Sequence, residues 1–420
     1  MQTITPETLA HQPGSTLRSK EIILSPSIPP IKQTFLSDDI SVVCLYKVHV
    51  NEHDSAVVLP LVMEQIEITD HVLVTLDVEE TIIYKNVINF YKEFYHHLSL
   101  AKLQKKIKNF SIIINRSYGH DDENIYETLF NGLDNLISLH WFMCSYSVLY
   151  PKTIPRNSNS DKVLFLPGKL HRRPQRSTVL FTILANENYR KRCEYAYTVN
   201  QSNWNGTTEE TFWQDIYSYI KDFNIEYDPT FEEVKSLFTE NQRDIDGLQA
   251  INEQFNNHML YPVQQEIYNS CSLELIAETW WPSSFHHLTE KTFRAMLAGQ
   301  VFVHLNSMHT KYLHKLGFRT FVHLGKNSWH REGWENIPAT MFCQDRDMKI
   351  VDLKNNLHRA FDLAKDIGEG NYKEIDNIIN HNRSLCEQYL KEYSDTLNAA
   401  HDNLFTPDII NKFYSVHGAW

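Results

Sequence analysis

Charged side chains gather where a helix is predicted to begin, in a segment that reads LTEKTFRAMLAGQVFVHL from Leu288. Thr289 can cap the helix, and its first turns carry Glu290, Lys291 and Arg294. Backbone N–H groups at a helix start attract anions, and a lysine adds a full positive charge to them. A carboxylate beside them can accept both hydroxyls of a ribose. The segment therefore suits a diphosphate joined to a ribose, while an ordinary cap with a solvated face is the alternative.

A second cationic group follows the apolar run KVLFLPG, which begins at Lys162. Its members are Lys169, His171, Arg172, Arg173 and Arg176. Pro174 suits the first position of a helix, which would place Arg173 and Arg176 on one face of its first turn. A solvated basic loop would have the same composition. The run LELIAET, however, would deliver Glu278 to the same sheet edge, and this favours an anion site.

Alternating strand-like and helix-like segments must position these residues. The strand-like runs are apolar and rich in β-branched residues: ISVVCLYKVHV, HVLVTLDV, FSIIINRS, KVLFLPG, CEYAYTV, LELIAET, QVFVHL and RTFVHL. Helical spacing marks the segments that begin at Lys85, Pro174, Thr289 and Thr310, and the chain from about Asp352 to its end. Phe293, Met296 and Leu297 would form the buried stripe of the helix that Thr289 opens. The pattern predicts an α/β fold.

A stretch rich in Pro, Ser and Asn, residues 151–162, divides this pattern in two. We expect one Rossmann-like domain at residues 1–155, a second at 156–350, and a helical segment at 351–420. Ligands of open α/β sheets bind beyond the carboxyl ends of the parallel strands. Two such domains would therefore face a central cleft that holds the candidate residues.

Composition limits the class of protein. The 420 residues, of which 42% are hydrophobic, can bury a large core. The formal net charge of −12 argues against a uniformly basic surface that coats nucleic acid, although a local basic cleft is compatible with it. The six cysteines lack zinc-site spacing, and the sequence has neither a dinucleotide-binding fingerprint nor a P-loop. No apolar run suits a signal peptide or a membrane helix, so we expect a cytoplasmic protein without a membrane partner.

The segment AETWWPSSFHHLTEKTFRAMLAGQVFVHL resembles the donor-binding motif of the fucosyltransferase-type glycosyltransferases of the GT-B class. In that motif a strand end with a Glu precedes Thr-Glu-Lys, an aromatic residue, an Arg and a buried strand. The segment is more similar still to phage and giant-virus glycosyltransferase-like proteins, whose pattern ends in Leu-x-x-Leu-Gly-Phe-x-Thr-Phe, here residues 313–321. Their second domain also opens with a buried strand and an Arg-rich loop, as KVLFLPGKLHRRPQR does. The resemblance covers part of the carboxy-terminal half and leaves residues 1–150 without a counterpart.

The resemblance implies a GT-B fold and a nucleotide sugar, linked to UDP or GDP, as substrate, with no separate cofactor and no metal. Lys291 would hold the diphosphate, Glu290 the ribose, and Glu278 the sugar or its phosphate neighbourhood. The further candidates for donor binding are Lys169, Arg172, Arg173, Arg176, Thr289 and Arg294. Thr279-Trp280 follows Glu278 where the fucosyltransferase pattern has Asn-Ser, so fucose is not the expected sugar.

Glycosyl transfer needs a base that removes the proton of the acceptor hydroxyl, and GT-B enzymes usually take it from the first domain. The run FSIIINRSYGHDDEN places His120, Asp121 and Asp122 on a glycine-containing loop after a strand. We expect the catalytic base among these three residues. Alternatively, they cap the following helix, NIYETLFNGL. Glu79 and Glu80, which follow HVLVTLDV, are the reserve candidates.

The resemblance to phage proteins implies as acceptor a hydroxymethylated pyrimidine, such as hydroxymethylcytosine, in double-stranded bacteriophage DNA. The protein would then act in the host cytoplasm. An enzyme that modifies a base must extrude it from the duplex, which requires a basic groove. KLQKKIKNF, from Lys102, could supply part of that groove together with the Arg-rich loop. The alternatives are a carbohydrate or protein acceptor, and a sugar-binding or virion protein without enzymatic activity; the oligomeric state stays open.

Overall fold

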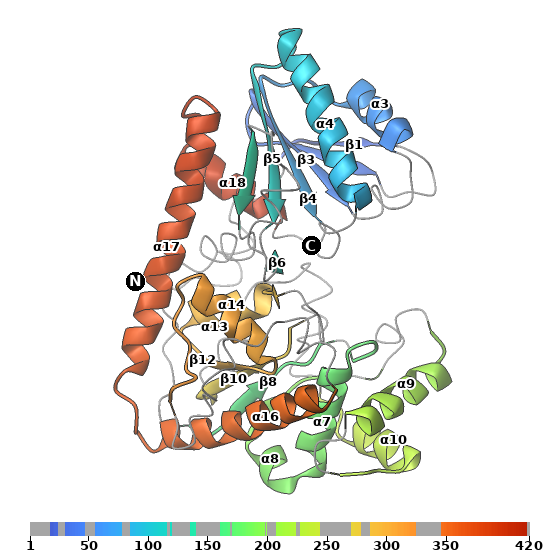
Figure 1. Ribbon diagram of the computed structural model, residues 1–420, viewed down its shortest axis with the longest axis vertical. Coiled ribbons are helices and arrows are strands. Elements are labelled where there is room, and N and C mark those ends of the chain that lie inside the picture. Colours follow the sequence, from blue (N-terminus) through green and yellow to red (C-terminus); the bar gives the residue numbers. More distant parts are fainter. Residues whose placement is uncertain are drawn as a thin grey trace. The chain divides into compact units, whose positions relative to one another are not determined.

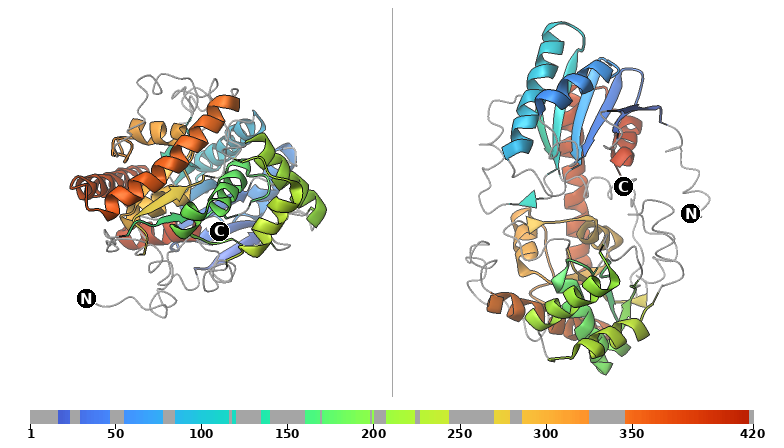
Figure 2. Two further views of the ribbon diagram at one scale, coloured as in Figure 1. Left: turned by 90° about the horizontal axis from the view of Figure 1, so that it is seen from below. Right: turned by 90° about the vertical axis from the view of Figure 1, so that its right-hand side faces the viewer.

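The computed structural model describes residues 17–23, 30–46, 55–77, 85–115, 118–119, 135–139, 160–168, 170–197, 199, 207–223, 227–243, 270–278, 286–324 and 346–417. The chain forms two compact units (Figures 1 and 2). The first unit comprises Met1–Tyr118, Asp122–Val148 and Glu387–Trp420, and the second comprises Gly119–Asp121 and Leu149–Cys386. Each unit combines a sheet that contains parallel strands with helices, so the predicted α/β class is confirmed.

The first unit is built on a six-stranded sheet with the order β1-β2-β3-β4-β5-β7 (Figure 1). Its strands are β1 (Ser19–Ile22), β2 (Ile31–Phe35), β3 (Ile40–Tyr46), β4 (His71–Asp77), β5 (Asn109–Asn115) and β7 (Leu136–Leu139). The strands from β3 to β7 are parallel, and β1 and β2 extend the sheet with antiparallel pairs. The apolar runs that predicted strands at Ile40, His71 and Phe110 form β3, β4 and β5.

Two helices of the first unit, α3 (Ser55–Gln65) and α4 (Lys85–Leu103), lie side by side over its sheet (Figure 1). The helix predicted from Lys85 is thus confirmed as α4. The apolar core joins Val62 of α3 and Phe94 of α4 to Val43, Val74 and Ile112 of the central strands. Burying each such side chain contributes about 1.5–3 kcal/mol, so this cluster fixes both helices on the sheet.

The second unit contains a parallel sheet with the order β12-β10-β8-β9. Its strands are β8 (Val163–Phe165), β9 (Cys193–Tyr195), β10 (Leu273–Ile276) and β12 (Val301–His304). The helices between them are α7 (Pro174–Ala185), α8 (Glu187–Lys191), α9 (Glu209–Asp222), α10 (Phe231–Glu240) and α13 (Glu290–Ala298), and α14 (Ser307–Lys315) follows β12. Every residue of β8, β10 and β12 is buried, as expected for a parallel sheet covered on both faces. The two-residue strands β6 (Tyr118–Gly119) and β11 (His286–His287) are the remaining described strands.

The chain from Arg346 onward is helical, as predicted, with α16 (Arg346–Gly368), α17 (Ile375–Ala400) and α18 (Pro407–His417). The apolar positions that the sequence marks in this part are buried: Phe361, Leu363, Ile367, Ile375, Ile378 and Ile379. Helix α16 packs against β8, β10 and β12. Helix α17 belongs to both units, because its residues up to Cys386 group with the second unit and those from Glu387 with the first.

The segment RTFVHL, predicted as a strand, is instead a chain of turns and bends between α14 and α16. Phe318, Phe321 and Leu324 are buried, and their spacing of three residues differs from the two-residue period of a strand. Side chains satisfy the backbone here: Asn382 accepts from the N–H of Arg319 and donates to its carbonyl, both at 2.8 Å. The prediction was wrong because side chains of α16 and α17, Arg359 and Asn382, supply hydrogen bonds that a neighbouring strand would have given.

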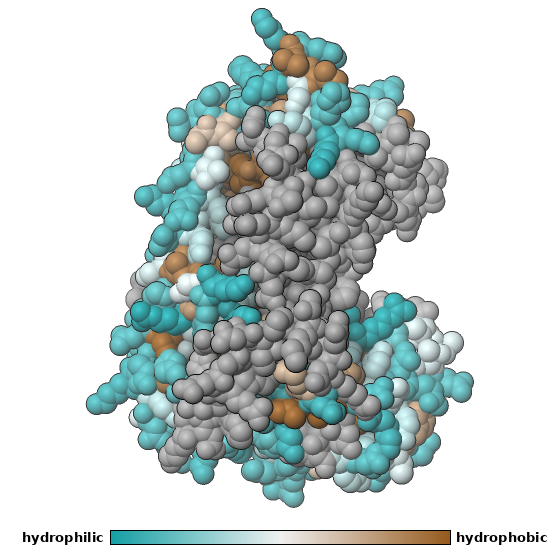
Figure 3. Space-filling view, viewed as in Figure 1, coloured by the Kyte–Doolittle hydropathy of each residue, from teal (hydrophilic) through white to brown (hydrophobic). Residues whose placement is uncertain are grey.

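The described surface has no large apolar area on the face drawn in Figure 3, where hydrophilic side chains surround small, separate hydrophobic patches. The exposed large apolar residues are scattered over the elements: Ile23, Ile68, Leu100, Leu103, Tyr227 and Val351. Among the described helices, none combines the length and the apolar character that crossing a membrane requires.

Candidate functional site

The sheet of the second unit reverses its direction of growth between β8 and β10. After β8 the chain passes through α7 and α8 to β9 on one side, and after β10 it passes through α13 to β12 on the other. Strands β8 and β10 are parallel neighbours, with Val163 opposite Leu273. Open α/β sheets bind ligands beyond the carboxyl ends of their strands at such a reversal. We therefore take the carboxyl ends of β8 and β10 as the candidate site.

The start of α13 is held at this edge by Glu278, which follows β10. Thr289 is the N-cap residue, as predicted, and its hydroxyl accepts from the N–H of Lys291 at 3.4 Å. The buried carboxylate of Glu278 accepts the N–H of Thr289 at 3.0 Å and the hydroxyls of Thr289 and Thr292. The predicted buried stripe is confirmed as well, since Phe293, Met296 and Leu297 are all buried. These hydrogen bonds fix the first turn of α13 against the end of β10.

A buried histidine completes this network. The Nε2 atom of His304 lies 2.8 Å from the hydroxyl of Thr292. That hydroxyl has one proton, which it donates to Glu278, so His304 donates from Nε2 and its Nδ1 carries no proton. Burial lowers the pKa of His304 to about 3, which keeps the ring neutral. We did not identify His304 from the sequence, because it lies within an apolar run and its partner is twelve residues away.

The start of α7 lies at the same edge and is tied to the same residue. The Nε2 of Gln175 donates to the carbonyl of Glu278 at 2.9 Å, and the Nη2 of Arg176 donates to the carbonyl of Ala277 at 3.2 Å. Both side chains are buried. Arg176 is therefore buried, whereas Arg173, three residues before it, is half-buried. Gln175 was not identified from the sequence either, and its position directly after the helix-opening Pro174 was the available signal.

The residues at the start of α7 are cationic, although helix starts seldom carry cations. Pro174 occupies the first position of the helix, as predicted, and Arg173 is the N-cap residue without a capping hydrogen bond from its side chain. The exposed Arg172 before it has a φ of 58°, in the left-handed region that L-residues rarely adopt. Helix starts favour acidic or hydroxyl side chains over cations, because the partial charge of the helix is positive there. An anion bound at this position would remove that conflict.

The two cations of the α13 segment have different surroundings. The Nζ of the half-buried Lys291 donates to the hydroxyl of Thr289 at 3.3 Å, so its charge lies over the start of α13. Arg294 instead pairs with the buried Glu274 of β10 at 3.1 Å. Lys291 is thus positioned for an anion at the helix start, whereas the guanidinium of Arg294 joins α13 to the sheet.

Several predicted site residues lie outside the part of the chain that the structure describes: Lys169, His120, Asp121, Asp122, Glu79, Glu80 and the side chain of Glu290. Arg172, Arg173, Arg176, Glu278, Thr289 and Lys291 are described, and the first turns of α7 and α13 bring them to one edge of the sheet. Among described residues, His, Cys, Asp and Glu form no group of three suited to a metal ion.

The basic segment KLQKKIKNF lies at the amino edge of the first unit's parallel strands. Helix α4 ends at Leu103 and β5 begins at Asn109, so the lysines between them precede the strand. Lys108 pairs with Asp70, which precedes β4, and this contact raises the pKa of the lysine. Because ligands bind at the opposite, carboxyl edge, the segment does not contribute a basic groove there.

Comparisons with known proteins were made at the level of families, of curated proteins and of solved structures. No family model matches the chain, and neither a curated protein nor a solved structure matches it.

Proposed function

We propose that the protein is a glycosyltransferase that transfers a sugar from a nucleotide sugar to an acceptor hydroxyl. One observation carries the proposal: Glu278 ties the starts of two helices to one sheet edge, through its carbonyl to Gln175 of α7 and through its carboxylate to Thr289 of α13. The edge is the reversal point of a parallel sheet, where such folds bind nucleotides. Two helix starts side by side suit the two phosphates of a diphosphate.

The charges at this edge support a diphosphate leaving group. Lys291 lies over the start of α13, and Arg172 and Arg173 stand at the start of α7. Negative charge grows on the diphosphate as the bond to the sugar breaks, and fixed cations and N–H donors stabilise it most in that state. The proposed enzyme thus needs no metal ion to hold its leaving group.

The proposal includes a GT-B arrangement, in which the second unit binds the donor and the segment that follows β5 supplies the catalytic base. The presence of two α/β units in one chain supports it. His120, Asp121 and Asp122 stay the proposed bases because they follow β5 (Asn109–Asn115) in sequence; His120 and Asp121 group with the second unit and Asp122 with the first. The proposed acceptor is a hydroxymethylated pyrimidine in DNA, supported by the similarity of residues 277–321 to phage proteins.

A donor panel tests the proposal directly. Thermal unfolding would be followed with UDP-, GDP- and CMP-sugars, and a ligand at 100 times its Kd raises the free energy of unfolding by about 2.7 kcal/mol. We expect one nucleotide series to raise the melting temperature. No shift with any nucleotide sugar at millimolar concentration would contradict donor binding.

The acceptor is tested with the donor that binds. DNA with and without hydroxymethylcytosine would be incubated with protein and donor, digested to nucleosides and analysed by mass spectrometry. We expect a nucleoside heavier by one sugar residue only from the hydroxymethylated DNA. Transfer to free sugars or to protein, with none to this DNA, would replace the proposed acceptor, whereas donor binding without any transfer would favour an inactive sugar-binding protein.

A further inference from the structure

A polar hollow of about 410 Å³ lies along the edge strand β9 of the second unit. It is lined by the residue that precedes β8, by the end of α8, by β9 itself and by the end of α10 with the residues that follow it. Lys162, one of the lining residues, precedes β8 and so marks the amino edge of the sheet. The hollow is therefore separate from the candidate site, which lies at the carboxyl ends of β8 and β10.

Positive charge predominates in the lining of this hollow. Its cationic residues are Lys162, Arg190, Lys191 and Arg243, and its acidic residues are Glu194 and Glu240. Four cations thus face two carboxylates in the lining, and one of the cations, Lys191, pairs with Glu187 outside it, in a chain whose formal net charge is −12. A local excess of this sign attracts anions even when the whole molecule is acidic.

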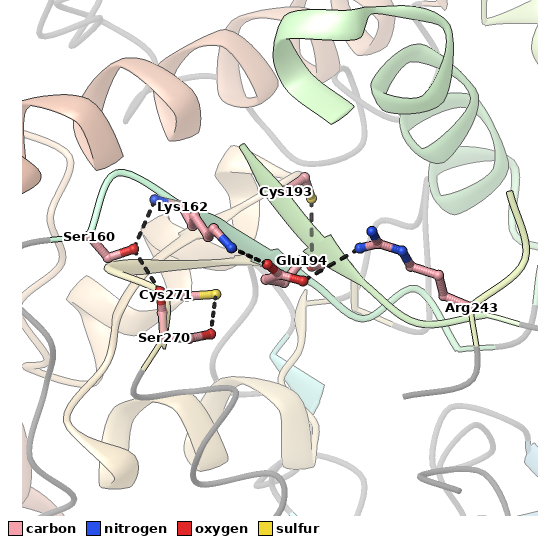
Figure 4. A network of polar contacts seen from close by, with 7 residues as sticks. All are labelled: Ser160, Lys162, Cys193, Glu194, Arg243, Ser270 and Cys271. Carbon is pink, nitrogen blue, oxygen red and sulfur yellow. Dashed lines mark hydrogen bonds and ion pairs between the residues drawn. The ribbon is translucent and has the colours of Figure 1, made fainter. Parts of the chain in front are cut away.

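Glu194 holds two of these cations close together, as Figure 4 shows. One carboxylate oxygen accepts from the Nζ of Lys162, and the other lies 3.5 Å from the Nη1 of Arg243. The contact with Glu194 raises the pKa of Lys162, so the lysine stays charged. The side chains are partly exposed, 42% for Lys162 and 50% for Arg243, and remain within reach of a solute.

Contacts with two tyrosines also hold Arg243 in place. The backbone of Arg243 forms two hydrogen bonds with the backbone of Tyr197, at 3.0 and 3.2 Å. Its guanidinium carbon lies 4.9 Å from the ring centre of the buried Tyr195. A ring beneath the guanidinium orients the planar fork and leaves the N–H groups that do not face Glu194 available for oxygen acceptors. The hollow thus contains a fixed arginine fork beside a lysine, the pair of groups that proteins use to bind phosphate.

We infer that this hollow binds a phosphate monoester, at a site distinct from the proposed donor site. A phosphate monoester carries a charge of about −1.5 to −2 at neutral pH, opposite in sign to the cations that predominate in the lining. The volume is within the usual range of about 300–1,000 Å³ for small-molecule pockets, so the phosphate can carry an organic group. Glu194 positions the two cations and at the same time competes with the ligand for them.

The test is calorimetric titration of the full chain with inorganic phosphate and with glucose 6-phosphate, without any nucleotide sugar. We expect Arg243→Gln to weaken binding about tenfold or more, because a charged bidentate contact is lost. Glu194→Gln should bind more tightly than the wild type, because it removes the competing carboxylate. The increase in phosphate affinity of Glu194→Gln tests the inference even if Arg243→Gln fails to fold.

Two matched variants test whether phosphate binding belongs to this hollow. Arg319→Gln removes an exposed arginine of the same unit that lies outside the hollow, and it should bind phosphate like the wild type. Lys291→Ala changes the proposed donor site, and in this background Arg243→Gln should still weaken phosphate binding. Absence of binding in the wild type, equal losses in Arg243→Gln and Arg319→Gln, or a loss confined to Lys291→Ala would each overturn the inference. Nucleotide-sugar binding is expected to survive Arg243→Gln, so the two sites can fail independently.

Discussion

His71 and His401 share a hydrogen bond between their Nδ1 atoms, which lie 3.1 Å apart in the buried interior of the first unit. One ring must donate and the other must accept, so this contact requires at least one neutral ring. The Nε2 of His401 also lies 2.8 Å from the hydroxyl of Ser111 on β5. The pair therefore joins the loop after α17 to the strands β4 and β5, which are far away in sequence.

Acidification should destabilise the first unit through this pair. Burial lowers the pKa of His71, against the opposing charges of Asp402 and Asp70, and lowers the pKa of His401 to about 4. Between pH 6.5 and 4 the unfolded chain binds more protons than the folded chain, so stability is full above pH 6.5 and falls as the pH falls. For His401 the loss is about 2 kcal/mol at pH 5.

Denaturant unfolding at pH 7.5 and at pH 5 checks this expectation. His401→Gln should show a smaller loss between the two values, because it removes one of the titrating rings. His96→Gln, at an exposed position on α4 of the same unit, serves as the control. Its free energy of unfolding should decrease between pH 7.5 and pH 5 by as much as that of the wild type. An identical decrease in the free energy of unfolding in all three proteins would mean that other groups cause the acid sensitivity.

Lys291→Ala should weaken donor binding by roughly ten- to hundredfold, because a contact between charged groups is worth about 1.5–3 kcal/mol. The turnover number should fall as well, since the leaving group gains charge in the transition state. Stability should change by less than about 1 kcal/mol, because Lys291 is half-buried and the hydrogen bond from its amine to Thr289 is long, at 3.3 Å. Calorimetric titration with the donor measures the effect, and Lys354→Ala, an exposed lysine of α16, is the control. Equal affinities in the two variants would remove Lys291 from the donor site.

Glu278→Gln should lower the free energy of unfolding by about 1.5–3 kcal/mol. The buried carboxylate of Glu278 accepts three hydrogen bonds. A glutamine amide has an NH2 group in place of one oxygen, so this group would face a donor and that hydrogen bond would be lost. Thr292→Val removes one of the three donors and should cost about 1 kcal/mol. Glu369→Gln, at an exposed position after α16, should be neutral. Chemical denaturation of the three variants measures these differences. A Glu278→Gln protein as stable as Glu369→Gln would show that the network does not hold α13.

Arg172 allows charge and backbone strain to be separated. Arg172→Ala and Arg172→Gly both remove the charge, so both should reduce donor affinity to a similar degree. Arg172→Gly should be about 1 kcal/mol more stable than Arg172→Ala, because glycine adopts the positive φ of 58° without the cost that L-residues have there. Thermal unfolding of the two variants measures the difference in stability, and titration with the donor measures the loss of affinity. Equal stability would mean that the turn changes conformation once the arginine is lost.

Local chemistry made much of the fold predictable. Apolar β-branched runs marked β3, β4, β8 and β12, and the rules for helix starts placed Pro174 and Thr289 correctly. The amino-edge position of KLQKKIKNF could also have been predicted, because a segment that precedes a strand lies at the edge where that strand begins. The features that these local rules did not predict depend on contacts between residues that are far apart in the chain.

Three particular residues illustrate this limit. Arg176 was predicted to bind the donor phosphates, yet its buried guanidinium donates a hydrogen bond to the carbonyl of Ala277, 101 residues later in the chain. Phe321 lies in a run that is apolar enough for a strand, but α16 and α17 supply the hydrogen bonds of that segment. His304 belongs to a network that becomes visible only when β12 and α13 are placed together. No spacing rule in one sequence reports such contacts.

The division of α17 between the two units has a consequence for synthesis on the ribosome. The first unit contains the beginning and the end of the chain, and His71 meets His401 across 330 residues. At about 5–20 residues per second, the ribosome needs roughly 15–70 s to make the intervening chain. During that interval β4 and β5 can pair, but the site that receives His401 beside Ser111 stays open. The first unit is therefore completed only after the second unit has been synthesised.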